Sequence, residues 1–179
     1  MKYIYFPPAI HLTNHCMLLM DVDGVENGDQ GKERSPHDHN RDYQKDRYSS
    51  VRALKALAKN LDIEFFLDCH CPMLQASKPY LYYSTEDADV VNAFSDILIN
   101  ATANSQAENP IIFDGTRNHD SGDHYATCSR GYFFLEAGSP FSTTLEFPYS
   151  GVVGDEYTPE RIYNFGIDLA KAIITYITK

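Results

Sequence analysis

The sequence predicts a single domain of the α/β class, with a mixed, mostly parallel sheet flanked by helices. Strand-like apolar runs alternate with stretches of helical period, and no internal repeat interrupts them. One run, residues 62–72 (DIEFFLDCHCP), passes directly from apolar side chains into Asp68, Cys69, His70 and Cys71. Open α/β sheets bind ligands beyond the carboxyl ends of their strands. We therefore expect the chain to be organised around His70.

The first half of the chain predicts two strands and one helix. Residues 16–20 (CMLLM) are apolar and predict a buried strand, and the Gly-punctuated polar stretch 21–34 predicts a long loop. Ser49 or Ser50 can cap a helix that ends near residue 59. A buried strand over residues 63–67 then stops at Asp68.

The second half continues the alternation. Residues 80–84 predict a short strand or an aromatic-lined loop. Apolar runs predict a weak strand at 110–113 and a strand at 141–147, with a polar loop at 114–123. Thr85 is placed to cap one helix. Thr158, followed by Pro159 at the first helical position, opens a long helix to the C-terminus.

Length and charge limit the classes of protein. The chain has 179 residues, which suits one domain over residues 1–179 with a sizeable core. A formal net charge of −10 argues against binding to nucleic acid or to an anionic membrane. No apolar run approaches the roughly 18 residues of a membrane span. The N-terminus does not resemble a signal peptide, and four oddly spaced cysteines predict reduced thiols, so we expect a cytoplasmic protein.

Several polar side chains have the chemistry of a hydrolytic site. The Asn40-Arg41 pair offers a guanidinium fork that matches a carboxylate in a bidentate way. Arg34 can stabilise a developing oxyanion. Glu146, at the end of a predicted strand, can take a proton from water and pass it to a leaving amine.

The ordered set of these residues resembles the catalytic half of the M14 zinc carboxypeptidases. The resemblance spans about residues 16–150 and begins with Asp21-Val-Asp-Gly24, which is similar to the family's Asn-Pro-Asp-Gly turn. It assigns roles to further residues: Asn40 and Arg41 hold the terminal carboxylate, Arg34 polarises the scissile carbonyl, His70 is the third zinc ligand, Tyr125 is the mobile tyrosine over the substrate, and Glu146 is the general base.

The resemblance implies an enzyme that removes single C-terminal residues from peptides or proteins by zinc-activated attack of water. Tyr132 competes with Tyr125 for the tyrosine role. Ser129 and Arg130 fall near the family's side-chain pocket, and a basic residue there would suit an acidic C-terminal side chain. The oligomeric state is left open.

One part of the family's pattern is absent. The first two zinc ligands come from a His-x-x-Glu turn, and none of the seven histidines has a Glu three residues later. We therefore expect an N-terminally truncated domain with an incomplete zinc site, inactive or very weak as this chain. Tight zinc binding would require substitute ligands among His11, His15, His37 and His39. A missing N-terminus would also weaken the inference about localisation.

Two other classes of function remain open. The chain could be a non-catalytic module that binds a carboxylate or peptide through Asn40, Arg41 and Arg34. It could also be a zinc amidohydrolase or deacylase acting on a small acidic molecule, because related folds carry out that chemistry.

Overall fold

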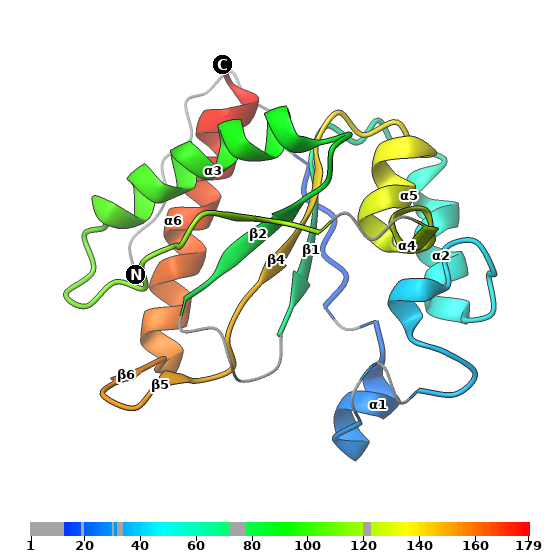
Figure 1. The fold of residues 1–179 in the computed structure, drawn as a ribbon, viewed down its shortest axis with the longest axis horizontal. Helices are drawn as coiled ribbons and strands as arrows, with labels where there is room; N and C mark the ends of the chain where they lie inside the picture. Colours follow the sequence, from blue (N-terminus) through cyan, green and yellow to red (C-terminus); the bar gives the residue numbers. More distant parts are fainter. Residues whose placement is uncertain (1–12, 19, 30, 32–33, 72–77, 120–122) are drawn as a thin grey trace.

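A four-stranded sheet forms the centre of the molecule (Figure 1). The structure, a computed structural model, describes residues 13–18, 20–29, 31, 34–71, 78–119 and 123–179. The strand order is β1-β4-β2-β3; β1 pairs with β4 and β2 with β3 in parallel, and β2 and β4 are antiparallel. The predicted mixed, mostly parallel sheet with flanking helices is confirmed. The elements are α1 (Val22–Asn27), the 3-10 helix η2 (His39–Arg41), α2 (Ser49–Ala58), β1 (Phe66–His70), β2 (Tyr80–Tyr83), α3 (Ala88–Ala103), β3 (Thr116–Asn118), α4 (Asp123–Thr127), α5 (Ser129–Leu135), β4 (Ser142–Glu146), β5 (Gly151–Val152), β6 (Asp155–Glu156) and α6 (Pro159–Ile177).

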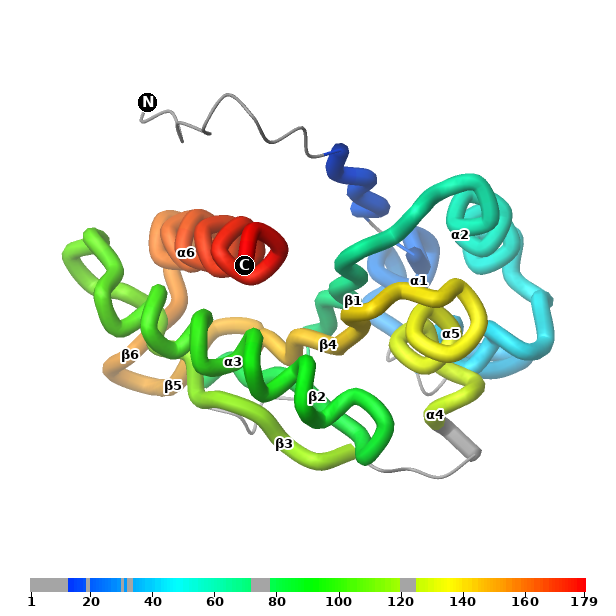
Figure 2. Tube along the Cα trace, turned by 90° about the horizontal axis from the view of Figure 1, so that it is seen from above, coloured from blue at the N-terminus to red at the C-terminus, as the bar shows by residue number. Residues whose placement is uncertain are grey.

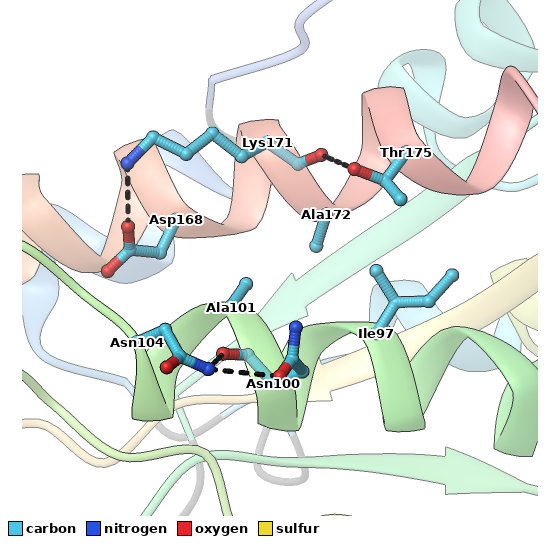
Figure 3. A pocket seen from close by; sticks show the side chains of 8 residues that line it. All are labelled: Ile97, Asn100, Ala101, Asn104, Asp168, Lys171, Ala172 and Thr175. Atoms are coloured by element: carbon cyan, nitrogen blue, oxygen red, sulfur yellow. Dashed lines mark hydrogen bonds and ion pairs between the residues drawn. The ribbon is translucent and has the colours of Figure 1, made fainter.

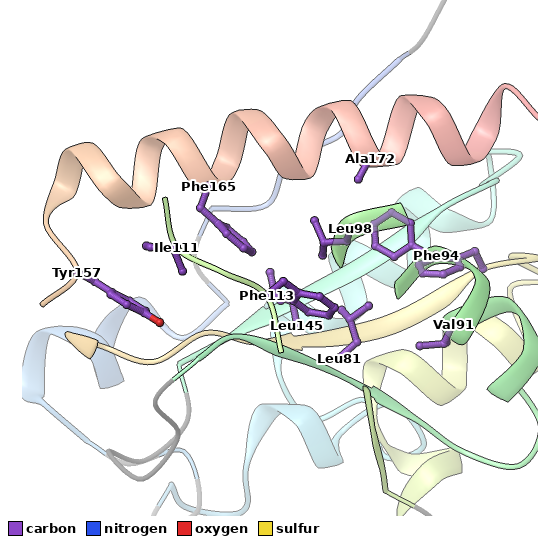
Figure 4. Close-up of a cluster of buried hydrophobic side chains, with 11 residues drawn as sticks. Leu81, Val91, Phe94, Leu98, Ile111, Phe113, Leu145, Tyr157, Phe165 and Ala172 are labelled. Atoms are coloured by element: carbon purple, nitrogen blue, oxygen red, sulfur yellow. The ribbon is translucent and has the colours of Figure 1, made fainter. Parts of the chain in front are cut away.

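Helices cover both faces of the sheet. Figure 2 shows α3 and α6 together on one side, with α2 and α5 on the other. The α3–α6 side holds the larger core, where Phe94, Leu98 and Phe165 pack on Leu81 and Leu145 of the sheet (Figure 4). The smaller core, on the α2–α5 side, contains Tyr43, Val51, Ala58, Tyr132 and Phe133.

Strand β1 contributes to both cores because its side chains alternate between the two faces of the sheet. Phe66 stacks on Phe133 of α5, with ring centroids 3.7 Å apart, whereas Leu67 packs against the α3–α6 core. The same period of two places Asp68 and His70 on the face of Phe66. Their polar groups therefore lie on the side of the sheet that α5 covers.

Several predicted elements are confirmed. The helix expected at residues 49–59 is α2, the strand at 80–84 is β2, and the strand at 141–147 is β4. Helix α6 begins as expected, because the Thr158 side chain accepts a hydrogen bond from the Arg161 N–H and Pro159 occupies the first turn. The caps predicted for the other helices are wrong: Tyr48 precedes α2 and Asp87 precedes α3, and neither makes a side-chain cap hydrogen bond.

Other expectations are wrong, and the reasons are physical. Residues 16–18 are exposed and form no strand. An apolar run becomes a buried strand only where other residues pair with it and cover it. The expected loop 21–34 contains α1, which Asp21 caps by accepting a hydrogen bond from the Gly24 N–H. Residues 110–113 run without strand pairing, and β3 lies instead in the expected polar loop. The strand predicted at 63–67 is shifted to 66–70 as β1, so His70 ends the strand rather than following it.

Two hollows are lined by residues outside the four-stranded sheet. One, of about 240 Å³, lies between α3 and α6. Figure 3 shows Asp168 and Lys171 at its margin, where Lys171 Nζ donates a hydrogen bond of 3.1 Å to Asp168 Oδ1. The other, of about 570 Å³, is an apolar groove lined by His15, Cys16, Met17, Leu18, Val22, Leu54 and Leu57. Among the described helices, none has the length and apolar character needed to cross a membrane.

Candidate active site

The ends of β1 and β4 bring His70 and Glu146 together. The two residues are Cα partners in the parallel pairing of these strands. Nδ1 of His70 lies 3.5 Å from Oε1 of Glu146, whose carboxylate is almost fully buried. Two residues that are 76 positions apart in sequence thus share one corner of the sheet, on the face covered by α5.

Asp68 fixes the orientation of the His70 ring. The Nε2 atom of His70 lies 2.8 Å from Asp68 Oδ2. Burial alone would raise the pKa of the Asp68 carboxyl, but the His70 charge and hydrogen bonds from His70 and Ser129 outweigh it and hold this pKa below its usual range. An ionised Asp68 can only accept, so Nε2 carries the proton. The Nδ1 atom is therefore the ring nitrogen turned toward Glu146.

The charge of the imidazole follows from the same contacts. Burial would lower the pKa of His70, but the Asp68 charge and hydrogen bond, together with Glu146, raise it well above its usual value. Both carboxylates therefore favour the protonated form of the imidazole.

The turn formed by η2 places Asn40 against this pair. Its Oδ1 atom accepts a hydrogen bond of 2.8 Å from the Ser129 N–H. Its Nδ2 atom lies 3.2 Å from His70 Nε2, but both groups carry N–H donors, so this contact is close packing and not a hydrogen bond. Asp38 caps the turn by accepting a hydrogen bond of 2.8 Å from the Asn40 N–H. The predicted Asn40-Arg41 pair and the predicted His70–Glu146 pair therefore meet in one place.

Arg34 and Arg41 differ in their partners. Arg34 forms ion pairs with Asp21 at 3.0 Å and Asp29 at 3.2 Å. Arg41 donates one hydrogen bond of 2.7 Å to the Asn40 carbonyl, and no Asp or Glu among the described residues forms an ion pair with it. A guanidinium without an acidic partner retains donors for an incoming carboxylate.

Tyr125 and Arg130 lie in a separate buried cluster around Asp87. The Tyr125 hydroxyl donates a hydrogen bond of 2.9 Å to Asp87, and Arg130 Nη1 lies 3.8 Å from the same carboxylate. Burial, followed by the Asp87 charge, raises the pKa of Tyr125 above its usual range. Both side chains are at least nine-tenths buried, so this structure presents neither to a substrate, and their roles in binding stay predictions.

Three of the four histidines named as possible substitute zinc ligands have neighbours other than His70 in the structure. His37 contacts Asp42 at 2.6 Å through Nε2. His39 stacks on Tyr48 with ring centroids 3.6 Å apart, and its Nδ1 lies 3.5 Å from Asp21. His15 is exposed beside the apolar groove. His11 lies outside the described residues.

A complete zinc centre does not fit the residues that the structure describes. Catalytic zinc takes three protein ligands in addition to water. The described part of the chain contains no group of three His, Cys, Asp or Glu side chains placed to hold a metal ion. His70 offers one ring nitrogen, Nδ1, which would have to lose its proton before it could bind a metal. The aspartate on its other ring nitrogen is the usual partner of a metal-ligating histidine.

Ser129 is the site residue whose role the sequence did not predict. It begins α5, and its hydroxyl donates a hydrogen bond to Asp68 Oδ2. A lone serine carries no local signal for such a contact, because its partners lie 61 and 89 positions away.

Comparison with solved structures identifies the fold. The chain is similar to a metallo-carboxypeptidase from Burkholderia cenocepacia, with a TM-score of 0.71 and 16% identity over 89% of this chain. It is also similar to a metallo-carboxypeptidase from Pseudomonas aeruginosa, solved with (2-guanidinoethylmercapto)succinic acid, with a TM-score of 0.65 and 15% identity over 89% of this chain. A third match is a succinylglutamate desuccinalase from Vibrio parahaemolyticus, with a TM-score of 0.56 and 14% identity over 84% of this chain.

These likenesses establish a carboxypeptidase-like fold and leave the activity to be proposed. No protein-family model matches the chain, and no curated protein matches it. The chain spans 43% and 44% of the two carboxypeptidase chains and 50% of the desuccinalase chain.

Proposed function

We propose that this carboxypeptidase-like chain forms the carboxylate-binding and proton-transfer part of a hydrolase that removes C-terminal residues from peptides or proteins. The observation that supports this most directly is the meeting of the Asn40-Arg41 turn with the His70–Glu146 pair. Asn40 Nδ2 lies 3.2 Å from the His70 ring, and Arg41 follows without an acidic partner among the described residues. A carboxylate-binding group and a proton-transfer group are thus adjacent.

Each residue has a defined part in this proposal. Arg41 binds the terminal carboxylate of the substrate, and Asn40 orients it. This places the last amide bond of the peptide near Glu146. The buried Glu146 carboxylate accepts a proton from the attacking water and returns it to the leaving amine. Arg34, now held by Asp21 and Asp29, would donate to the oxyanion.

Zinc is the metal that the proposal implies, and the described residues supply only His70 toward it. We therefore propose that this chain alone hydrolyses peptides weakly or not at all. The sequence gives the same expectation, because the His-x-x-Glu pattern is absent from it.

A second candidate is a deacylase acting on a small N-acyl amino acid. The similarity to the Vibrio parahaemolyticus desuccinalase supports it. Both candidate substrates contain an amide bond beside a free carboxylate, so the same Arg41 contact serves either one. A non-catalytic carboxylate-binding module is a third candidate, supported by the incomplete metal site.

Binding and turnover separate the three candidates. The purified chain, with zinc added, is mixed with an N-blocked dipeptide, with its C-terminal amide, and with N-succinylglutamate. Calorimetry measures binding and chromatography measures cleavage. We expect the free acid to bind and the amide to bind at least tenfold more weakly, because a charge-assisted hydrogen bond contributes about 1.5–3 kcal/mol.

Variants assign the roles. Arg41→Ala should remove the preference for the free acid, and Glu146→Gln should retain binding and remove any cleavage. Lys59→Ala, which removes an exposed positive charge at the end of α2, is the control and should change neither. Cleavage confined to N-succinylglutamate would favour the deacylase, and binding without cleavage in every condition would favour the binding module. Equal binding of the acid and its amide would refute the proposal.

A further inference from the structure

Ser129 joins two parts of the candidate site that are distant in sequence. The residue is 2% exposed at the first position of α5. Its hydroxyl donates a hydrogen bond to Asp68, and its backbone N–H donates one of 2.8 Å to the Asn40 side chain. One residue thus contacts both the partner of His70 and the carboxylate-binding turn.

The contact with Asp68 falls on the oxygen that His70 also uses. Oδ2 of Asp68 accepts from the Ser129 hydroxyl and from His70 Nε2 at 2.8 Å. Two donors on one oxygen fix the rotation of the carboxylate, which in turn fixes the plane of the imidazole and the direction of its Nε2 proton. Without the hydroxyl, the carboxylate could rotate and the ring could turn its Nδ1 away from Glu146.

The contact with Asn40 extends this effect to the substrate side. The Asn40 amide has its oxygen directed to the Ser129 N–H, so its nitrogen is directed to the His70 ring. The N-terminal residue of α5 therefore sets the separation between the carboxylate-binding turn and the His70–Glu146 pair.

We propose that Ser129 is a positioning residue that holds the Asp68–His70 pair in register with the Asn40-Arg41 turn. This inference rests on the proposed function, because it assigns His70 and Glu146 to the reacting centre. The structure supplies a matched control in Ser142, a fully buried serine on β4. Its hydroxyl donates a hydrogen bond of 2.8 Å to the Arg130 carbonyl.

The test measures the His70 ring directly in the metal-free chain. Nitrogen-resolved NMR detects the Nε2 proton of His70, assigned with a His70→Gln variant, and its exchange with water. Loss of a hydrogen bond to a charged group typically shifts an equilibrium by about tenfold or more. We therefore expect Ser129→Ala to accelerate this exchange by at least about tenfold. Ser129→Thr should restore slow exchange, and Ser142→Ala should leave it unchanged.

Two results would overturn the inference. One is wild-type exchange at His70 in a folded Ser129→Ala variant. The other is equal acceleration in Ser142→Ala, which would show general loosening of the α5 side. If Ser129→Ala does not fold, Ser129→Cys decides in its place, because a thiol keeps most of the volume but donates weakly, and wild-type exchange there counts against the inference. The measurement needs neither zinc nor substrate, so its outcome is separate from that of the hydrolysis test.

Discussion

Asp42 offers a quantitative test of what stabilises the loop that follows the Asn40-Arg41 turn. Its side chain is fully buried and accepts hydrogen bonds from the Arg47 N–H at 3.0 Å and the Tyr48 N–H at 2.8 Å, with His37 Nε2 at 2.6 Å. It directly follows the Asn40-Arg41 turn. The perturbation is Asp42→Asn, which preserves the shape and replaces one accepting oxygen with a donor.

The expected loss follows from the three contacts. If the remaining Oδ1 atom stays toward His37 and Arg47, the new NH2 group replaces Oδ2 and lies against the Tyr48 N–H. Two hydrogen-bond donors then face each other. A buried donor left unsatisfied costs about 1–3 kcal/mol, and the two surviving bonds lose their charge assistance. We expect a fall of about 3 kcal/mol in the free energy of unfolding. With a urea slope of about 2 kcal/mol/M, the midpoint should fall by about 1.5 M.

The assay is urea unfolding followed by circular dichroism at several pH values. Burial would raise the pKa of Asp42, but the Tyr48 and Arg47 N–H groups and His37 lower it below its usual value. A lowered folded-state pKa means that the stabilisation is complete above the unfolded pKa of about 3.9 and is lost as pH falls through the folded value. The difference between wild type and variant should be present at pH 5 and above and should shrink below pH 4.

The control is Asp46→Asn in the same loop. Asp46 is exposed and forms an ion pair of 2.7 Å with Lys55, so its replacement should cost less than about 1 kcal/mol. A loss below about 1 kcal/mol for Asp42→Asn, or one that persists unchanged at pH 3, would refute the assignment of Asp42 as an ionised anchor.

Three further substitutions test other parts of the fold by the same unfolding assay. Gly131→Ala should destabilise by about 3 kcal/mol, because a Cβ there would lie 1.8 Å from the Tyr125 carbonyl oxygen; a cost below about 1 kcal/mol would contradict the close approach of α4 and α5. Asp87→Ala should cost about 3–5 kcal/mol, because it leaves the buried Arg130 without its counter-charge, and a neutral result would show that this pair contributes nothing. Phe94→Ala should cost about 3–5 kcal/mol from the fully buried core, whereas Leu18→Ala, at a side chain 85% exposed, should change stability by less than about 0.5 kcal/mol.

Local signals predicted the elements that depend on local physics. The Thr158 cap, the following proline and the apolar period located α6, and the apolar run at 141–147 located β4. Residues 16–18 show the limit of such signals. An apolar run indicates that a segment favours burial, but whether other residues cover that segment depends on the rest of the molecule.

The candidate site was predictable to the extent that its residues carry chemical signatures. The ordered resemblance to the zinc carboxypeptidases singled out His70, Glu146 and Asn40, and the structure brings these three side chains together. The role of Ser129 could be seen only in the structure, because Asp68 and Asn40 lie 61 and 89 positions away from it in the sequence. The partners of Arg34 were equally hidden, since the Asp21 and Asp29 carboxylates that hold it have no pattern of their own.

The position of β1 at an edge of the sheet has a consequence for the behaviour of the chain in solution. Among the described strands it pairs with β4 alone, and exposed Met17, Leu18 and Val22 lie along the nearby groove. An unpaired strand edge beside apolar side chains favours self-association. The net charge of −10 opposes it through repulsion between copies, and this repulsion reaches only about 10 Å at 0.1 M salt. Ionic strength should therefore decide whether the chain stays dispersed, with added salt promoting assembly through the β1 edge.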